Sequence, residues 1–269
     1  MPGLSPLPYG DMAITAPAVP ARSFTGEDVA TLRRIETRVL WLATYLVHHA
    51  NHVRPNVDGL KVGGHQASSA SLVTVLTALY GHFLRATDRV AVKPHASPVF
   101  HALQYLRGRL PLEALQRFRA RGGLQAYPSR TKDPDDVDYS TGSVGLGAVT
   151  ATFAGLTARY LESHFGPGAR RRYLAVVGDA ELDEGNVWEA VAEEHTRTLG
   201  NVIWIVDLNR QSLDRVVPDG KAERIRRMFR ANGSHVIDLK YGQALQEAFA
   251  RPGGPRLRAR RGSSRSRAW

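Results

Sequence analysis

Cysteine is absent from the 269 residues of this chain, which excludes disulfide bonds, thiolate metal sites and cysteine nucleophiles. No apolar run approaches the roughly 20 residues that a helix needs to span a bilayer, so no membrane segment is expected. The first residues lack a basic stretch followed by an apolar core, so they do not resemble a secretory signal. A cytoplasmic location is therefore expected.

Acidic residues are missing from one end of the chain. Residues 251–269 contain seven arginines and no aspartate or glutamate, and subtracting seven from the net charge of +11 leaves +4 for the remainder. The basic character is largely a tail. A nucleic-acid-binding protein is one hypothesis, but no aromatic interleaving or basic recognition helix supports it, so nucleic acid is not expected as a partner.

Composition divides the chain into three zones. Residues 1–24 contain five prolines and are expected to form an irregular arm. Residues 25–250 carry alternating helical and strand patterns and are expected to form the folded domain. Residues 251–269 are rich in Arg, Gly and Ser and are expected to be disordered, although a shifted reading frame would give the same composition.

Several segments of the middle zone have helical patterns. Thr25 is a candidate N-cap for a helix whose apolar residues recur at three- and four-residue steps. Residues 67–84 predict a largely buried helix. Ser97 and Pro98 occupy the sequence positions of an N-cap and a first helical residue. The small residues of the segment 148–161 indicate a helix that packs closely on its neighbours.

Two continuous apolar runs, 173–179 and 201–209, predict buried strands. A helical pattern between them favours a right-handed parallel βαβ unit. A helix over 222–233 and a strand over 234–240 are expected to extend the sheet. The predicted fold class is α/β, an open, mostly parallel sheet with helices on both faces.

A cluster of carboxylates follows the first of these strands, in VVGDAELDEGNVWEA (176–190). Asp179 and Asn209 each lie at the carboxyl end of a predicted strand, the edge where open α/β sheets bind ligands. A carboxylate, an amide oxygen and a nearby main-chain carbonyl suit Mg²⁺ completed by phosphate oxygens. A calcium-binding loop fails on register, because Glu184 and Ala190 fall where such a loop needs glycine and a bidentate acid. A solvated acidic loop remains the alternative.

The segments GDAELDEGNVWEA and VDLNRQSLD resemble the thiamine diphosphate motif, which begins GDG and ends in asparagine about thirty residues later. Further blocks resemble transketolase-like thiamine diphosphate enzymes, and within them the first component of bacterial homodimeric pyruvate dehydrogenase. These blocks, in the family's order, are GGHQAS (63–68), PHASP (94–98), LRGRL (106–110), QAYPS (125–129) and STGSVGLG (140–147). The resemblance covers roughly residues 30–245 and implies the thiamine-diphosphate-binding fold of the transketolase N-terminal type.

The resemblance implies a role for each matching residue. Asp179, the side chain of Asn209 and the main-chain carbonyl of Gln211 are the expected Mg²⁺ ligands. His65 and His95 are expected to approach the diphosphate and the substrate side of the thiazolium. Residues expected to contact the cofactor are Ser68, Tyr127, Ser143, Val144, Gly145, Gly178, Ala180 and Glu181, with Val144 near the pyrimidine and the main chain of Ala180 and Glu181 against the diphosphate.

For each histidine, a structural role is the alternative to a functional one. Any lone histidine is more often structural, but His65 and His95 each lie in a matching block. His48, His49 and His52 are interpreted as structural, because two ligands on one helix without an acidic or distant third partner make a weak zinc site.

Three positions depart from the family pattern. Ala180 replaces the third motif residue, glycine, at a cost of about 1–2 kcal/mol if the main chain there needs positive φ. Asp207 occupies a position that is often asparagine in relatives. Lys93 occupies one that is usually glutamine.

The resemblance also implies a second domain, whose glutamate acts on the aminopyrimidine ring. This chain is expected to hold only the diphosphate half, and to be inactive without a second chain that carries the pyrimidine-binding domain. Association with such a chain, or with a second copy of itself in a homo-oligomer, is expected. The first hypothesis is therefore the diphosphate-binding subunit of a split enzyme that acts on a 2-oxo acid or a ketose. A truncated, catalytically silent remnant of a pyruvate dehydrogenase component is the second.

Overall fold

The structure is a computed structural model, and it describes residues 25–55, 59–209, 211–212, 215–216 and 220–262. The arm predicted for residues 1–24 and the last part of the tail, 263–269, lie outside the described residues. The motif residues Leu213 and Asp214 also lie outside them.

The first helix begins where the sequence predicts. α1 (Gly26–His48) has Thr25 as its N-cap, and Thr25 and Asp28 form a reciprocal capping box. One turn of π-helix, His49–Val53, continues it. The capping box satisfies main-chain donors that the first turn of the helix would otherwise leave exposed.

Two helical predictions are right in place but not in detail. The segment 67–84 is not one helix, because α2 (Gln66–Ala70), α3 (Val73–Ala78) and a π-helical turn succeed one another. α4 (Ser97–Leu106) has Ala96 as its N-cap instead of Ser97, because a 3₁₀ turn, Pro94–Ala96, leads directly into the helix. A short helix, α5 (Leu112–Gln116), follows.

Three parallel strands form the sheet in the order β1-β2-β3. They are β1 (Arg89–Ala91), β2 (Tyr173–Gly178) and β3 (Val202–Asp207). Both predicted apolar runs are strands, and α7 (Gly185–Ala192) lies between them in the chain, as expected for a βαβ unit. A short antiparallel pair, β4 (Gln211–Ser212) and β5 (Arg215–Val216), follows β3.

Small residues let α6 (Leu146–Phe165) pack tightly against the strands. A Cβ at Gly155 would come within 2.5 Å of Val202 Cγ2, and one at Gly147 within 3.3 Å of Ala91 Cβ. The expectation of a closely packed helix in this segment is confirmed. Its close fit fixes the position of the helix N-terminus relative to the sheet.

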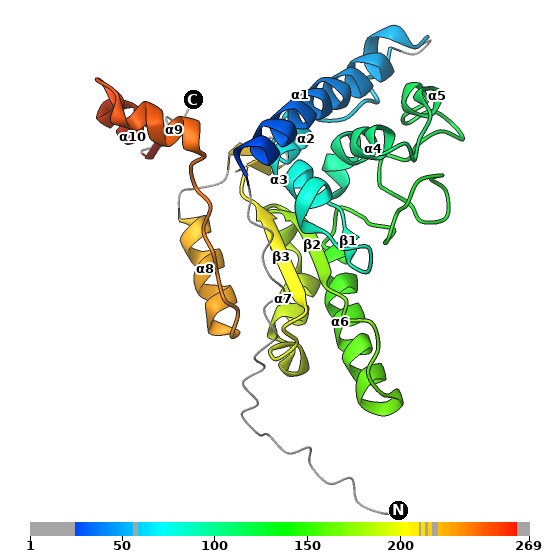
Figure 1. Cartoon of the computed structure of the whole chain (residues 1–269), viewed down its shortest axis with the longest axis vertical. Coiled ribbons are helices and arrows are strands. Elements are labelled where there is room, and N and C mark those ends of the chain that lie inside the picture. Colours follow the sequence, from blue (N-terminus) through cyan, green and yellow to red (C-terminus); the bar gives the residue numbers. More distant parts are fainter. Residues whose placement is uncertain (1–24, 56–58, 210, 213–214, 217–219, 263–269) are drawn as a thin grey trace, which may run out of the picture.

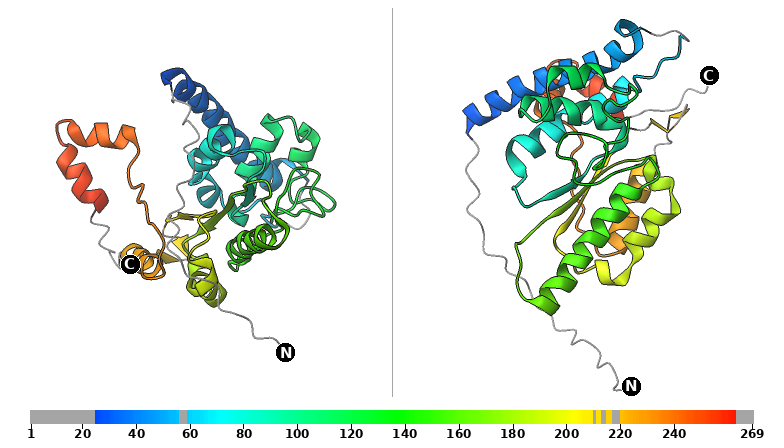
Figure 2. Two further views of the ribbon diagram at one scale, coloured as in Figure 1. Left: turned by 60° about the horizontal axis from the view of Figure 1, so that its bottom comes forward. Right: turned by 90° about the vertical axis from the view of Figure 1, so that its right-hand side faces the viewer.

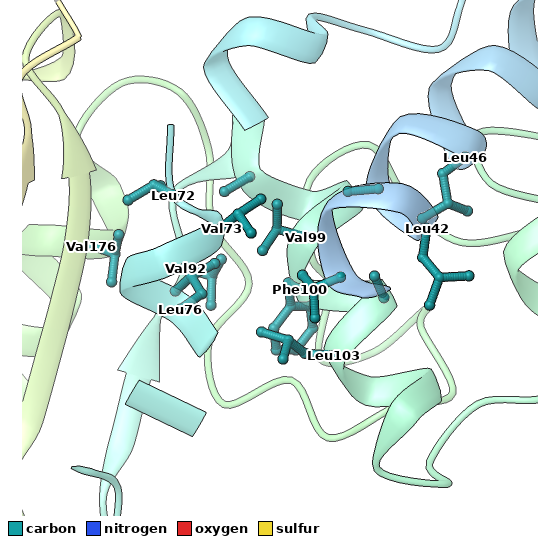
Figure 3. Packing of buried hydrophobic residues seen from close by; sticks show 14 of the residues in the cluster. Leu42, Leu46, Leu72, Val73, Leu76, Val92, Val99, Phe100, Leu103 and Val176 are labelled. Atoms are coloured by element: carbon teal, nitrogen blue, oxygen red, sulfur yellow. The ribbon is translucent and has the colours of Figure 1, made fainter. Parts of the chain in front are cut away.

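Helices cover both faces of the sheet, as predicted (Figure 1). On one face, Val90, Leu174 and Val176 belong to a buried cluster with α1, α3 and α4. Figure 3 shows Val176 of this cluster with residues of the three helices. On the other face, Ala91 and Val177 belong to a second buried cluster with α6, α7 and α8 (Lys221–Ala231). Because consecutive strand residues point to opposite faces, the continuous apolar runs supply both clusters.

The C-terminal part differs from expectation. The segment 234–240 is not a strand in the structure, and Ile237 and Leu239 in it are 73% and 94% exposed. Its alternating apolar residues suit a strand, but a strand also needs a hydrogen-bonding neighbour. α9 (Gln243–Ala250) and α10 (Gly254–Gly262) follow, and both lie apart from the sheet (Figures 1 and 2).

α10 occupies part of the segment whose composition predicts disorder. Arginine, leucine and alanine are good helix formers, which accounts for a helix within this basic sequence. Among the described residues, no helix is both long and apolar enough to cross a membrane.

Candidate functional site

The carboxyl ends of β2 and β3 lie side by side. Gly178 is paired with Asp207 in the register of the two strands, and the Asp179 N–H donates to the Asp207 main-chain carbonyl at 3.1 Å. Asp179 is 1% exposed. The expected positions of Asp179 and Asn209 at one edge of the sheet therefore agree with the pairing of the strands.

A buried ion pair occupies the same edge. Lys93 Nζ lies 2.9 Å from Asp207 Oδ2, with the two side chains 4% and 10% exposed. The same carboxylate oxygen accepts hydrogen bonds from Ser71 Oγ at 2.6 Å and from Asn209 Nδ2 at 3.4 Å. Ser71 Oγ is also within hydrogen-bonding distance of the main-chain carbonyl of Ser68, at 3.1 Å. The GGHQAS segment is thus joined to the end of β3.

Glu181 turns back toward the strand that it follows. The Gly178 N–H donates to Glu181 Oε1 at 3.0 Å, and the residue is 5% exposed. Burial raises the pKa of the Glu181 carboxyl, while hydrogen bonds from Gly178 and Gly145 and the charge of Lys93 act in the opposite direction. The hydrogen bond from Gly178 thus ties the Glu181 side chain to the main chain just before Asp179.

Ala180 departs from the family's glycine without strain. Its φ is −72° and its ψ is −31°, in the right-handed helical region that any L-residue adopts. The main chain does not need positive φ here, so the cost considered for alanine does not arise.

The glycine-rich segment lies against the acidic segment. Gly145 has φ of +78°, and a Cβ there would lie 2.3 Å from Val187 Cγ2. Asn186 Nδ2 donates to the main-chain carbonyl of Val144 at 3.1 Å. Ser143, the residue before Val144, is half-buried. Glycine is required here by both conformation and space. The first residues of the 20-residue helix α6 are thereby held next to the motif.

His65 and His95 come together in space. Their ring centroids are 5.9 Å apart, with His65 exposed as the N-cap of α2 and His95 half-buried in the 3₁₀ turn before α4. Burial lowers the pKa of His95, and the positive charges of Lys93, His65 and Arg119 lower it further. His95 is therefore biased toward the neutral imidazole, which can accept or donate a proton.

Arg119 is a candidate residue that the sequence analysis missed. Its φ is +57°, the only positive value for a non-glycine residue in the described chain, and its Nη1 donates to the Val62 carbonyl at 2.8 Å. Its guanidinium fills the space beside Gly64, and it interacts electrostatically with His95 and Tyr127. Tyr127 is 45% exposed, and its place in the cofactor site stays a prediction. No motif marks Arg119, because its position depends on the folded loop.

The residues present at this edge suit a hard cation. Asp179 offers a carboxylate, Asn209 an amide oxygen and Gln211, in β4, a main-chain carbonyl, whereas the carboxylate of Asp207 is paired with Lys93. No group of three or more His, Asp or Glu side chains suited to a metal occurs in the described chain. A site with few protein ligands is typical of Mg²⁺ that shares phosphate oxygens. The set fits a magnesium diphosphate, and the individual ligand roles remain predictions.

The HHANH histidines lie at the end of α1 and in the π-helical turn that follows it. The rings of His48 and His52 are 5.1 Å apart on the helix, and His49 packs against Tyr45 with centroids 5.4 Å apart. Burial, Arg54 and His48 lower the pKa of His49. No group of three or more His, Asp or Glu side chains suited to a metal occurs around them in the described residues, and their structural role stays a prediction.

The chain is similar to known proteins of one family. The family model described as "Transketolase, thiamine diphosphate binding domain" matches residues 61–251. The chain is 32% identical over 263 residues to the pyruvate dehydrogenase E1 component of Pseudomonas aeruginosa, covering 91% of this chain and 29% of that protein. It is 31% identical over 228 residues to the Escherichia coli pyruvate dehydrogenase E1 component, covering 80% of this chain and 25% of that protein.

The fold is similar to that of transketolase itself. A crystal structure of a transketolase mutant from Pichia stipitis superimposes with a TM-score of 0.64 at 20% identity, covering 78% of this chain and 32% of that one. The chain thus spans between a quarter and a third of the length of these relatives. The family match, which covers most of the chain, shows that this chain belongs to the family of transketolase thiamine diphosphate binding domains.

Proposed function

We propose that this chain holds the diphosphate of thiamine diphosphate together with Mg²⁺, as part of an enzyme that acts on a 2-oxo acid or a ketose. Asp179, the Asn209 side chain and the main-chain carbonyl of Gln211 hold the cation. The observation that carries the proposal is the convergence of buried Asp179, the Asp207–Asn209 segment and the left-handed Gly145 at one edge of the sheet.

The surroundings of this edge suit an anion. The main-chain segment Gly178–Glu181 and the first turn of α6 flank the acidic edge, and helix N-termini carry free N–H groups and a partial positive charge. Gly145 keeps the main chain free of a side chain where Val187 approaches. The chain thus supplies donors for the phosphate oxygens and oxygen ligands for the cation.

The two histidines define the substrate side. When bound, the cofactor supplies the carbanion chemistry at its thiazolium ring. His95, with its lowered pKa, is suited to exchange protons with the substrate, and His65 lies beside it. Val144, 44% exposed, is available to contact an apolar part of the cofactor.

The pyrimidine half of the site is proposed to come from a partner. A second chain would carry the pyrimidine-binding domain, and a homo-oligomer is the alternative assembly. A cytoplasmic location is part of the same proposal. The relatives are pyruvate dehydrogenase E1 components, which favours a 2-oxo acid as substrate.

Calorimetry tests the cofactor proposal. Asp179→Ala should abolish Mg²⁺-dependent binding of thiamine diphosphate, because it removes the only charged ligand proposed for the cation. Glu189→Ala is the matched control, since it removes an exposed carboxylate from the neighbouring helix α7. Equal affinities for Asp179→Ala and the wild type would overturn the metal assignment.

Turnover tests the partner proposal. The purified chain should not decarboxylate pyruvate with cofactor, Mg²⁺ and an artificial electron acceptor, whereas addition of a partner that carries the pyrimidine-binding domain should start turnover. Steady decarboxylation by the chain alone would contradict the half-site interpretation. Cofactor binding without turnover under any pairing would favour the silent remnant.

A further inference from the structure

We propose that Lys93 and Asp207 form a positioning pair for the cofactor site. In this pair, Asp207 orients the Asn209 amide toward the cation, and Lys93 donates to the diphosphate. The inference rests on the proposed function and extends it to two residues that are not metal ligands. It is carried by the geometry of their buried contact at the ends of β2 and β3.

The pair is buried where the cofactor is proposed to bind. Lys93 Nζ and Asp207 Oδ2 are 2.9 Å apart, and neither side chain is more than 10% exposed. A Cβ built on Gly178 would lie 3.1 Å from Lys93 Cε and 3.4 Å from its Nζ, so the ammonium lies against the residue that precedes Asp179. Removing one member of such a buried pair leaves an uncompensated charge.

Asp207 determines which end of the Asn209 amide points toward it. An ionised carboxylate only accepts hydrogen bonds, so Asn209 points its nitrogen at Asp207, with Nδ2 3.4 Å from Oδ2. The other end of the amide, its oxygen, is the atom proposed to bind the cation. Partners of this kind orient metal ligands and raise metal affinity.

Ser71 and Lys93 hold the orienting carboxylate. Ser71 Oγ donates to Asp207 Oδ2 at 2.6 Å, so the carboxylate is fixed from the end of α2, from β3 and from the turn after β1 together. An ammonium has three N–H donors, and one of them serves Asp207. Within the described residues, two donors of Lys93 therefore remain for phosphate oxygens beside Gly178.

The charges explain why the two residues belong together. Asp179, Glu181 and Asp207 place three carboxyl groups at this edge, and Lys93 is a buried cation among them. Without Lys93, the charge of Asp207 would repel the diphosphate. Without Asp207, Lys93 would lose its partner and Asn209 its orientation.

A double-mutant cycle tests the pair, with Mg²⁺ plus thiamine diphosphate and Mg²⁺ plus inorganic pyrophosphate as calorimetric probes. Lys93→Gln should weaken binding about tenfold or more, and Asp207→Asn should weaken it in the wild-type background. In the Lys93→Gln background, Asp207→Asn should instead strengthen binding, because it removes the uncompensated charge. The double variant should therefore bind better than Lys93→Gln alone.

Two further variants keep the test decisive. Ser71→Ala removes one donor to Asp207 from an exposed position without changing charge, so it should fold normally and weaken Mg²⁺-dependent binding several-fold, on the order of a single hydrogen bond. Asp88→Asn is the control, because it breaks an ion pair between Arg172 and Asp88, the residue just before β1. This variant should leave cofactor affinity unchanged. Thermal unfolding of each variant separates lost binding from lost folding.

The outcomes distinguish the two proposals. The pair would be overturned, and the proposed function would stand, if the wild type binds both probes and Lys93→Gln and Ser71→Ala bind them with the same affinity. Strictly additive effects in the double-mutant cycle would have the same consequence. No binding of either probe to the wild type would overturn the proposed function, and the pair with it.

Discussion

The imidazole rings of His65 and His95 lie with their centroids 5.9 Å apart, although one caps α2 and the other precedes α4. A positive charge on His65 disfavours protonation of His95, because the two cations would repel each other. Burial lowers the pKa of His95, and the charges of Lys93, His65 and Arg119 lower it further, so the ring stays neutral over more of the pH range than a solvated histidine.

Removing one ring should change the other. In His65→Gln, the pKa of His95 is expected to rise toward its ordinary value, since one of the positive neighbours that lower it is gone. Burial and Lys93 act more strongly than His65, so the pKa should remain below the value of a solvated histidine. Titration of the His95 ring protons by NMR measures the change, and a fall in the pKa on substitution would contradict the contact.

The lowered pKa of His95 also predicts how stability depends on pH. The unfolded chain binds a proton at this residue more readily than the folded chain, so folding stability rises with pH between the folded pKa and the ordinary value of 6.5. Denaturant unfolding between about pH 5 and pH 7 should therefore show a smaller dependence of stability on pH in His95→Gln than in the wild type. An unchanged dependence would mean that His95 titrates alike in both states.

Gly145 should not tolerate a side chain. Gly145→Ala is expected to destabilise the chain by about 1–2 kcal/mol for its left-handed backbone, plus about 1–3 kcal/mol for the clash with Val187. Gly108→Ala is the control, because Gly108 has φ of +72° with no atom near the built Cβ. Equal losses for the two variants, measured by chemical denaturation, would show that the close packing contributes nothing.

Deleting residues 251–269 should leave the folded domain intact. Both buried clusters are formed by residues up to Val236, while α10 packs against α9 apart from the sheet. The thermal midpoint is expected to stay within about 4 °C of the wild type. A larger loss would place the end of the folded domain further along the chain.

The sequence predicts the elements whose patterns are local. The apolar runs around Val176 and Ile205 are long enough to mark buried strands, and Thr25 lies at the start of an amphipathic helix. The polar residues at the strand ends follow from these assignments, since carboxyl ends of parallel strands share one edge. The amino-acid pattern alone therefore locates this edge of the sheet.

Elements that depend on distant partners were not predictable in this way. β1 is three residues long, and it is a strand because it pairs with β2. The segment 234–240 has a strand-like pattern but is not part of a sheet in the structure. Arg119 reaches the histidines through a left-handed turn, and Lys93 meets Asp207 only in the folded sheet, so sequence spacing marks neither contact.

The most direct test of the central claim is to locate the cation in the chain. Mn²⁺ takes the same hard oxygen ligands as Mg²⁺, and as a paramagnetic ion it broadens the amide NMR signals of residues near the metal. With thiamine diphosphate present, the account predicts selective broadening at Asp179, Asn209 and Gly145, with the Mg²⁺ complex as the reference and no such effect in Asp179→Ala. Broadening centred elsewhere, for example on the HHANH segment, or broadening that survives in Asp179→Ala, would contradict it.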